Sequence, residues 1–131
     1  MSDRVQPLLM FQGNAEEAMR FYVSLFPEAR VVEIARFGKA APGAEGHVSR
    51  ATFTIGGQTI QCTDSTVHDA FGFTPAFSLH VQCTSKERMQ VLVQRLAEGG
   101  KVYMPLGQYA FSKQFAWVAD RFGVSWQLNM G

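Results

Sequence analysis

The sequence predicts an α+β fold of two β-α-β-β-β modules, and three observations lead to that prediction. First, the run Gly57–Cys62 (GQTIQC) is echoed near the C-terminus by Gly123–Leu128 (GVSWQL), with a glutamine at the same place in each. Second, a strand-like segment and a helix-like segment precede each copy. Third, apolar and polar residues alternate through several short runs, as is typical of strands. A repeat of this kind indicates two equivalent halves and pairs Gln61 with Gln127.

In the first half, a helix lies between the first two of four expected strands. It begins at Asn14, a favoured N-cap residue, with Glu17 at the spacing of a capping box. It ends before Pro27, which disfavours the α conformation in the residue that precedes it. Residues 56–57 (Gly-Gly) form a hairpin turn. The expected strands are 5–12, 30–37, 48–55 and 58–63.

In the second half, Thr84 or Ser85 caps a helix that the glycine pair 99–100 closes. Residues 105–111 are expected to form a loop, and residues 64–75 connect the two halves. The expected strands are 76–83, 101–104, 114–119 and 124–130. The chain is thus expected to be one domain, 1–131, made of modules at about 1–66 and 75–131. The curved, mixed sheets of two such modules can form a cup, which is a natural place for a ligand.

Composition excludes several classes of protein. The formal net charge is +1, so there is no electrostatic case for binding nucleic acid or an anionic membrane. No apolar run approaches the ~20 residues that span a bilayer. The N-terminal residues resemble no signal peptide, which predicts a cytoplasmic protein. Cys62 and Cys83 have no metal-binding spacing and are expected to be reduced thiols.

Three segments resemble a known family. They are Gly13–Tyr22 (GNAEEAMRFY), Gly99–Leu106 (GGKVYMPL) and Asp120–Trp126 (DRFGVSW). Together they resemble the PhnB-like branch of the glyoxalase/vicinal oxygen chelate (VOC) superfamily, whose members are often labelled 3-demethylubiquinone-9 3-methyltransferase. The resemblance covers nearly the whole chain. It implies a paired βαβββ fold and, together with open sheet edges, a homodimer.

The resemblance also implies where a metal would be held. Metal-dependent relatives use one residue from the first strand and one from the fourth strand of each module, typically His and Glu. Counting along this chain places those positions near Pro7 and Ala76 and at Gln61 and Gln127, and neutral amides are weak ligands. We therefore expect no metal and no cofactor. His80 lies past the expected position, and it is either a surface histidine or a displaced acid–base or metal-binding group.

The methyltransferase label finds no support in the sequence. A glycine-rich G-x-G-x-x-G loop that could cradle a nucleotide-like cofactor is absent, and βαβββ modules do not build a doubly wound parallel sheet. His47 and His68 lie in expected loops and are expected to be solvated. A small acid–base cluster of His68, Asp69 and Asp64 is a weak alternative, since it rests on adjacency in sequence.

Aromatic residues on the expected strands and loops have two interpretations. They form ordinary core packing, or they form the apolar wall of a pocket whose floor carries the two glutamines. The second interpretation gives as pocket candidates Gln61, Gln127, Phe115, Trp117, Trp126 and Tyr109. It predicts binding of a small apolar or aromatic molecule without the usual divalent metal. The alternative is a VOC enzyme of lyase, isomerase or transferase type that uses no metal or an atypical one, and catalysis is left open.

Overall fold

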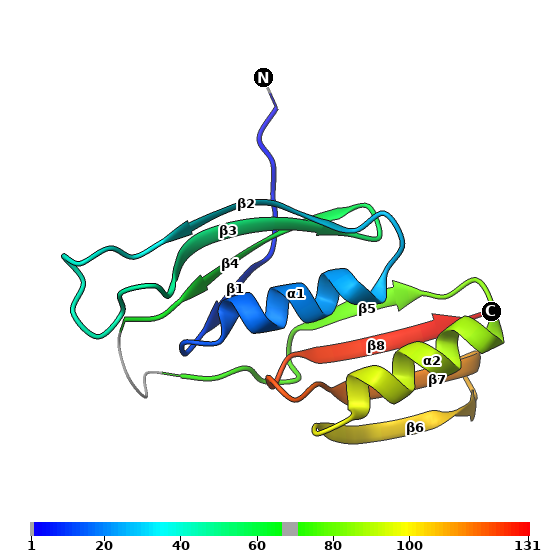
Figure 1. Ribbon diagram of the computed structural model, residues 1–131. Helices are drawn as coiled ribbons and strands as arrows, with labels where there is room; N and C mark the ends of the chain where they lie inside the picture. The colour runs from blue at the N-terminus through cyan, green and yellow to red at the C-terminus, as the bar shows by residue number, and fades with distance from the viewer. Residues whose placement is uncertain (1, 67–70) are drawn as a thin grey trace. The chain divides into compact units, whose positions relative to one another are not determined.

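The structure, a computed structural model, describes residues 2–66 and 71–131. The chain divides between residues 70 and 71 into two compact units, here unit 1 and unit 2. Each unit has the element order β-α-β-β-β, as the repeat predicts (Figure 1). In each sheet the first strand runs parallel to the last, while the other neighbours are antiparallel. The predicted α+β class with mixed sheets is thus confirmed.

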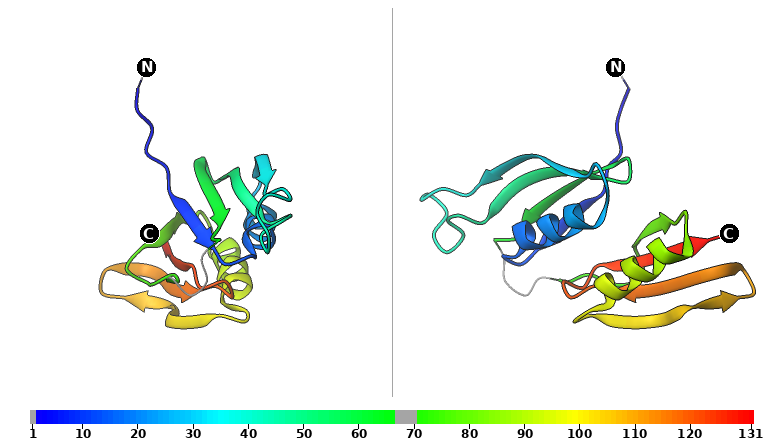
Figure 2. Two further views of the ribbon diagram at one scale, coloured as in Figure 1. Left: turned by 90° about the vertical axis from the view of Figure 1, so that its left-hand side faces the viewer. Right: turned by 45° about the vertical axis from the view of Figure 1, so that its right-hand side comes forward.

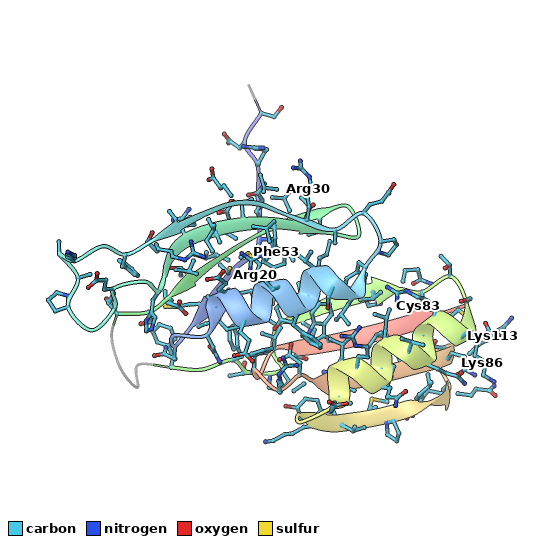
Figure 3. All side chains as sticks on the ribbon, in the orientation of Figure 1. Arg20, Arg30, Phe53, Cys83, Lys86 and Lys113 are labelled. Carbon is cyan, nitrogen blue, oxygen red and sulfur yellow. The ribbon has the colours of Figure 1, made fainter. Side chains whose placement is uncertain are left out.

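Unit 1 is a sheet of order β1-β4-β3-β2 with one helix against it. Its elements are β1 (Leu8–Phe11), α1 (Ala15–Leu25), β2 (Arg30–Arg36), β3 (Val48–Ile55) and β4 (Gln58–Asp64). The apolar stripe of α1 packs on the sheet, where Tyr22 stacks on Phe53 with ring centroids 6.2 Å apart. Phe53 is labelled in Figure 3. Gly56 and Gly57 turn β3 into β4 with φ angles of 53° and 83°, a conformation that glycine adopts at little cost.

The N-terminus of α1 is capped from a distance. Asn14 occupies the N-cap position, but its side chain makes no capping hydrogen bond, which contradicts the expected capping box. Asp64, at the end of β4, provides the acceptor instead. Its Oδ1 accepts hydrogen bonds from the backbone N–H groups of Gly13 and Ala15, both at 2.9 Å, and its Oδ2 accepts one from Val48 at 2.9 Å. A carboxylate is well placed there because the helix dipole is positive at that end.

Unit 2 repeats the design with a sheet of order β5-β8-β7-β6. Its elements are β5 (Ser78–Gln82), α2 (Lys86–Ala97), β6 (Lys101–Tyr109), β7 (Ser112–Ala119) and β8 (Ser125–Met130). Ser85 caps α2, as one of the two predicted caps, and its Oγ accepts from the Arg88 N–H at 3.1 Å. Gly100 is required after the helix, because a Cβ at this position would collide with the carbonyl oxygen of Ala119.

The expected loop at 105–111 is wrong, since β6 continues through Pro105 and Gly107 to Tyr109. Proline is tolerated because β6 is an edge strand, where a missing N–H need not break the ladder. The pairing of β6 with β7 shifts register three times along its length. Such irregularities accommodate residues that regular pairing disfavours.

In both units the helix covers one face of the sheet and leaves the other face uncovered by any element of the same unit (Figure 2). We call this second side the open face. None of the helices in the described part of the chain is long and apolar enough to cross a membrane.

Candidate functional site

The repeated glutamines occupy the open faces of their sheets. Gln61 lies in register with Leu8 on β1 and Thr52 on β3. Gln127 lies in register with His80 on β5 and Trp117 on β7. Residues in register point to the same side of a sheet, and the residues before and after each glutamine are buried on the helix side. Gln61 and Gln127 therefore each lie on the open face of their own sheet. That both open faces enclose one cup stays a prediction.

In unit 1 the glutamine is engaged at both ends of its amide. The Oε1 atom of Gln61 accepts from Thr52 Oγ1 at 3.0 Å, and its Nε2 donates to Oε1 of Gln6 at 3.0 Å. The carbonyl end and one amide proton are thus paired inside the unit. One lone pair of Oε1 and one amide proton are left for a ligand at this position.

In unit 2 the corresponding glutamine belongs to a chain of hydrogen bonds. Trp117 Nε1 donates to Ser125 Oγ at 2.8 Å, and Ser125 Oγ lies 2.7 Å from Ser78 Oγ. Gln127 Nε2 donates to the same Ser78 Oγ at 3.4 Å. Within the described residues of unit 2, Oε1 of Gln127 has no hydrogen-bond partner. The two units therefore differ, because the Gln61 carbonyl already accepts a hydrogen bond from Thr52.

The strand pairing corrects the expected metal positions. The residue in register with Gln61 is Leu8, one residue beyond Pro7, and the residue in register with Gln127 is His80, four beyond Ala76. The second shift is larger because β5 begins at Ser78 and Gln127 pairs with the third residue of that strand. The four positions thus hold one leucine, two glutamines and one histidine. Among the described residues, no three His, Cys, Asp or Glu side chains gather closely enough to hold a metal ion.

Three of the predicted aromatic residues lie together in unit 2, on β6 and β7. Trp117 is half-buried, and its ring centroid is 5.2 Å from that of Tyr103. Phe115, two residues earlier on the same face, meets Tyr109 edge to face at 6.1 Å. Beside Tyr109, the hairpin between the two strands contains a hollow of about 260 Å³. Phe115, which is buried, and Trp117, which is half-buried, therefore lie on the face that carries Gln127, and Tyr109 lies toward its hairpin end.

Trp126 does not line this face, contrary to the prediction. It is fully buried on the side of the sheet that α2 covers, and its Nε1 donates to Oδ2 of Asp120 at 2.9 Å. The alternation of β8 explains this, because a residue next to Gln127 in a strand must point to the other face. Trp126 is a core residue of unit 2.

The proposed acid–base cluster around Asp64 is also unsupported. The Asp64 carboxylate is buried and engaged by three backbone N–H groups, while His68 and Asp69 lie outside the described residues. His47 packs against Gly13, where a Cβ would lie 3.3 Å from its ring. The structure instead adds Ser78, which the sequence reasoning missed, and brings His80, for which the sequence left two interpretations open, into register with Gln127. Their alternation along β5 was the signal that could have placed them beside Gln127.

Comparison with known proteins identifies the family. A family model described as 3-demethylubiquinone-9 3-methyltransferase matches residues 3–129. The structure of a PhnB protein from Bacillus cereus is 48% identical, covers 98% of this chain and 100% of its own, and superposes with a TM-score of 0.94. Protein PA1353 from Pseudomonas aeruginosa is 30% identical, with 98% of each chain covered and a TM-score of 0.83.

A more distant likeness concerns the fold alone. A glyoxylase/bleomycin resistance protein/dioxygenase domain from Frankia is 16% identical, with 100% of this chain and 94% of that domain covered and a TM-score of 0.70. The chain therefore belongs to the PhnB-like family described as 3-demethylubiquinone-9 3-methyltransferase and has the fold of the glyoxalase/VOC superfamily.

Proposed function

We propose that this protein binds a small apolar or aromatic molecule on the open face of unit 2, without the usual divalent metal. The observation that carries the proposal is the Gln127 carbonyl, which has no hydrogen-bond partner in the described part of unit 2 and lies in a polar network beside Trp117 and Phe115. Aromatic walls with a few placed polar groups are the usual composition of a small-molecule site. The apolar rings supply contact area, and the amide sets the orientation of the ligand.

The side chains at the four metal positions support binding without a metal. Leu8 cannot ligate an ion, and Gln61 is occupied by Thr52 and Gln6. The remaining pair, His80 and Gln127, offers one imidazole and one neutral amide, a weaker set than the His and Glu ligands implied for metal-dependent relatives. We expect elemental analysis to find no stoichiometric Zn, Ni, Fe or Mn and chelators to leave the melting temperature unchanged.

One observation favours a second candidate, a metal-independent or atypical-metal enzyme of the superfamily. His80 lies in register with Gln127, so an imidazole stands beside the proposed ligand position. Imidazole both donates and accepts protons, and proton transfer is its commonest catalytic role. We do not extend methyl transfer to this chain, because the Gly13–Asn14 connection between β1 and α1 is not a glycine-rich nucleotide loop.

A thermal-shift screen of aromatic compounds tests binding. A compound that stabilises the protein should lose most of its effect in Gln127→Leu, because loss of a ligand hydrogen bond costs about 1–3 kcal/mol. The matched control is Gln90→Leu, the same exchange at an exposed position of α2 on the other side of the unit 2 sheet. Equal loss in both variants, or unchanged binding in Gln127→Leu, would place the ligand elsewhere.

We also propose that the protein is a cytoplasmic homodimer. Each sheet has two edge strands, and exposed apolar side chains lie on or beside those of unit 2, among them Phe77 on the β5 side and Val102 on β6. Pairing would cover both features. Light scattering at micromolar concentration should give twice the 14.5 kDa chain mass, and the mass of one chain would contradict the dimer.

A further inference from the structure

The hydrogen bonds on the open face of unit 2 have a definite direction. The indole N–H of Trp117 can only donate, so Ser125 Oγ accepts it. Ser125 is 1% exposed, so no bulk water is at hand to take its own hydroxyl proton. A buried hydroxyl proton needs an acceptor, and Ser78 Oγ lies 2.7 Å away. The direction that satisfies every group therefore runs from Trp117 through Ser125 to Ser78.

Ser78 is the end of this chain. Its Oγ accepts from Ser125 and from the amide of Gln127, so both of its lone pairs are engaged. Its own proton is then left to point away from the network. The Ser78 residue is partly exposed, so that proton can reach a bound molecule. Donors at the end of such chains are strengthened, because each bond polarises the next.

Next to this donor stands an acceptor. Gln127 donates through Nε2 to Ser78, and its Oε1 has no partner among the described residues of unit 2. Neither side chain in register with Gln127, His80 or Trp117, is a lysine or arginine. The open face of unit 2 thus presents one hydroxyl donor and one carbonyl acceptor side by side, next to an indole ring.

We propose that the ligand is an uncharged, flat molecule that carries a carbonyl oxygen beside an N–H or O–H group, of which an aromatic carboxamide is the simplest example. This proposal rests on the proposed function and names its ligand class. The carbonyl accepts from Ser78, the N–H donates to Gln127, and the ring lies against Trp117. A carboxylate would set a second acceptor against Gln127 Oε1, and a hydrocarbon would leave both polar groups unpaired.

The two tryptophans provide a built-in probe and control for nuclear magnetic resonance. Trp117 lies on the open face and Trp126 is buried on the face that α2 covers. We would titrate the full ¹⁵N-labelled protein with benzamide, benzoate and toluene at neutral pH and follow both indole N–H signals and the Gln127 side-chain amide. Benzamide should shift Trp117 and Gln127, leave Trp126 in place, and bind about tenfold more tightly than benzoate or toluene, as expected for one good hydrogen bond.

Two variants sharpen the test. Ser78→Ala should reduce benzamide affinity about tenfold, since it removes the donor. Gln127→Glu should bind benzamidine, which is cationic, more tightly than benzamide. Gln90→Leu on α2 should change neither affinity. Benzoate or toluene binding as tightly as benzamide would overturn the assigned ligand class and leave the proposed function standing. If none of the probes moves the Trp117 signal, both fail.

Discussion

The capping of α1 by Asp64 makes a stability prediction that the structure allows us to work out. Hydrogen bonds to a charged group contribute about 1.5–3 kcal/mol each. The bonds from Ala15 and Val48 are buried, whereas the bond from Gly13 is only partly buried, so water can replace it. Asp64→Ala leaves two buried N–H donors without an acceptor and should lower the free energy of unfolding by about 4 kcal/mol. Asp64→Asn keeps one carbonyl oxygen, loses the bond to Val48 and should cost about 2 kcal/mol.

Urea unfolding followed by far-ultraviolet circular dichroism measures these changes, with the free energy extrapolated linearly to water. The control is Asn14→Ala, which should cost less than about 0.5 kcal/mol because the Asn14 side chain caps nothing. An ordinary N-cap would cost about 1 kcal/mol. The reasoning is refuted if Asn14→Ala destabilises the protein as much as Asp64→Asn does. Tryptophan fluorescence adds a second readout, because both tryptophans lie in unit 2.

Three further predictions concern pH and packing. Burial and the charge of Asp64 raise the pKa of the Cys62 thiol from 9.0 to about 12. Between these pH values the thiol ionises only in the unfolded chain, so the free energy of unfolding should fall above pH 9, and should fall less in Cys62→Ala. Hydrogen bonds from Arg36 and then Arg20 lower the pKa of Glu16 below 4.5. The ionised Glu16 therefore stabilises the fold by at most about 0.5 kcal/mol above pH 4.5, and this stabilisation is lost on acidification. In Glu16→Gln the melting temperature should fall less steeply as the pH is lowered. Gly100→Ala should cost about 3 kcal/mol in urea unfolding, because the new methyl group meets a backbone carbonyl of β7, and an equal cost for Gly38→Ala, where space is open, would contradict this.

The element order was predictable because it depends on local patterns. Alternation, helical spacing and glycine turns are each read within a few residues, and they located the helices and strands of the described residues close to their observed positions, except for β6. The extent of β6 was missed, because Pro105 and Gly107 are poor strand residues that only an edge position tolerates. The cap at Asp64 was missed for a different reason. It acts on residues 49 and 51 positions earlier in the chain, and no local pattern encodes such a contact.

In the candidate site, too, local patterns were predictable and contacts between distant segments were not. Alternation along β8 places Ser125 with Gln127 on one face and Trp126 on the other, so this part of the site could be predicted from the sequence. What the sequence could not provide was the register between strands. The parallel pairing of β5 with β8 brings His80 and Ser78 beside Gln127, although about 47 residues separate them in sequence. A displacement of a few residues in that pairing would present a different set of side chains.

The repeat predicted that Gln61 and Gln127 would be equivalent, and their surroundings show why they are not. Each is in register with a residue on the neighbouring antiparallel strand, Thr52 in unit 1 and Trp117 in unit 2. A threonine hydroxyl reaches the adjacent glutamine and satisfies its carbonyl. The indole of Trp117 instead directs its N–H past the glutamine to Ser125 Oγ, so Oε1 of Gln127 is left without a partner among the described residues of unit 2. Thr52→Val should therefore free the Gln61 carbonyl without loss of side-chain volume. In isothermal titration, a carboxamide should then show a second, weaker binding step with Thr52→Val that the parent protein lacks. One identical step in both proteins would contradict the idea that a single neighbouring side chain sets the difference between the two glutamines.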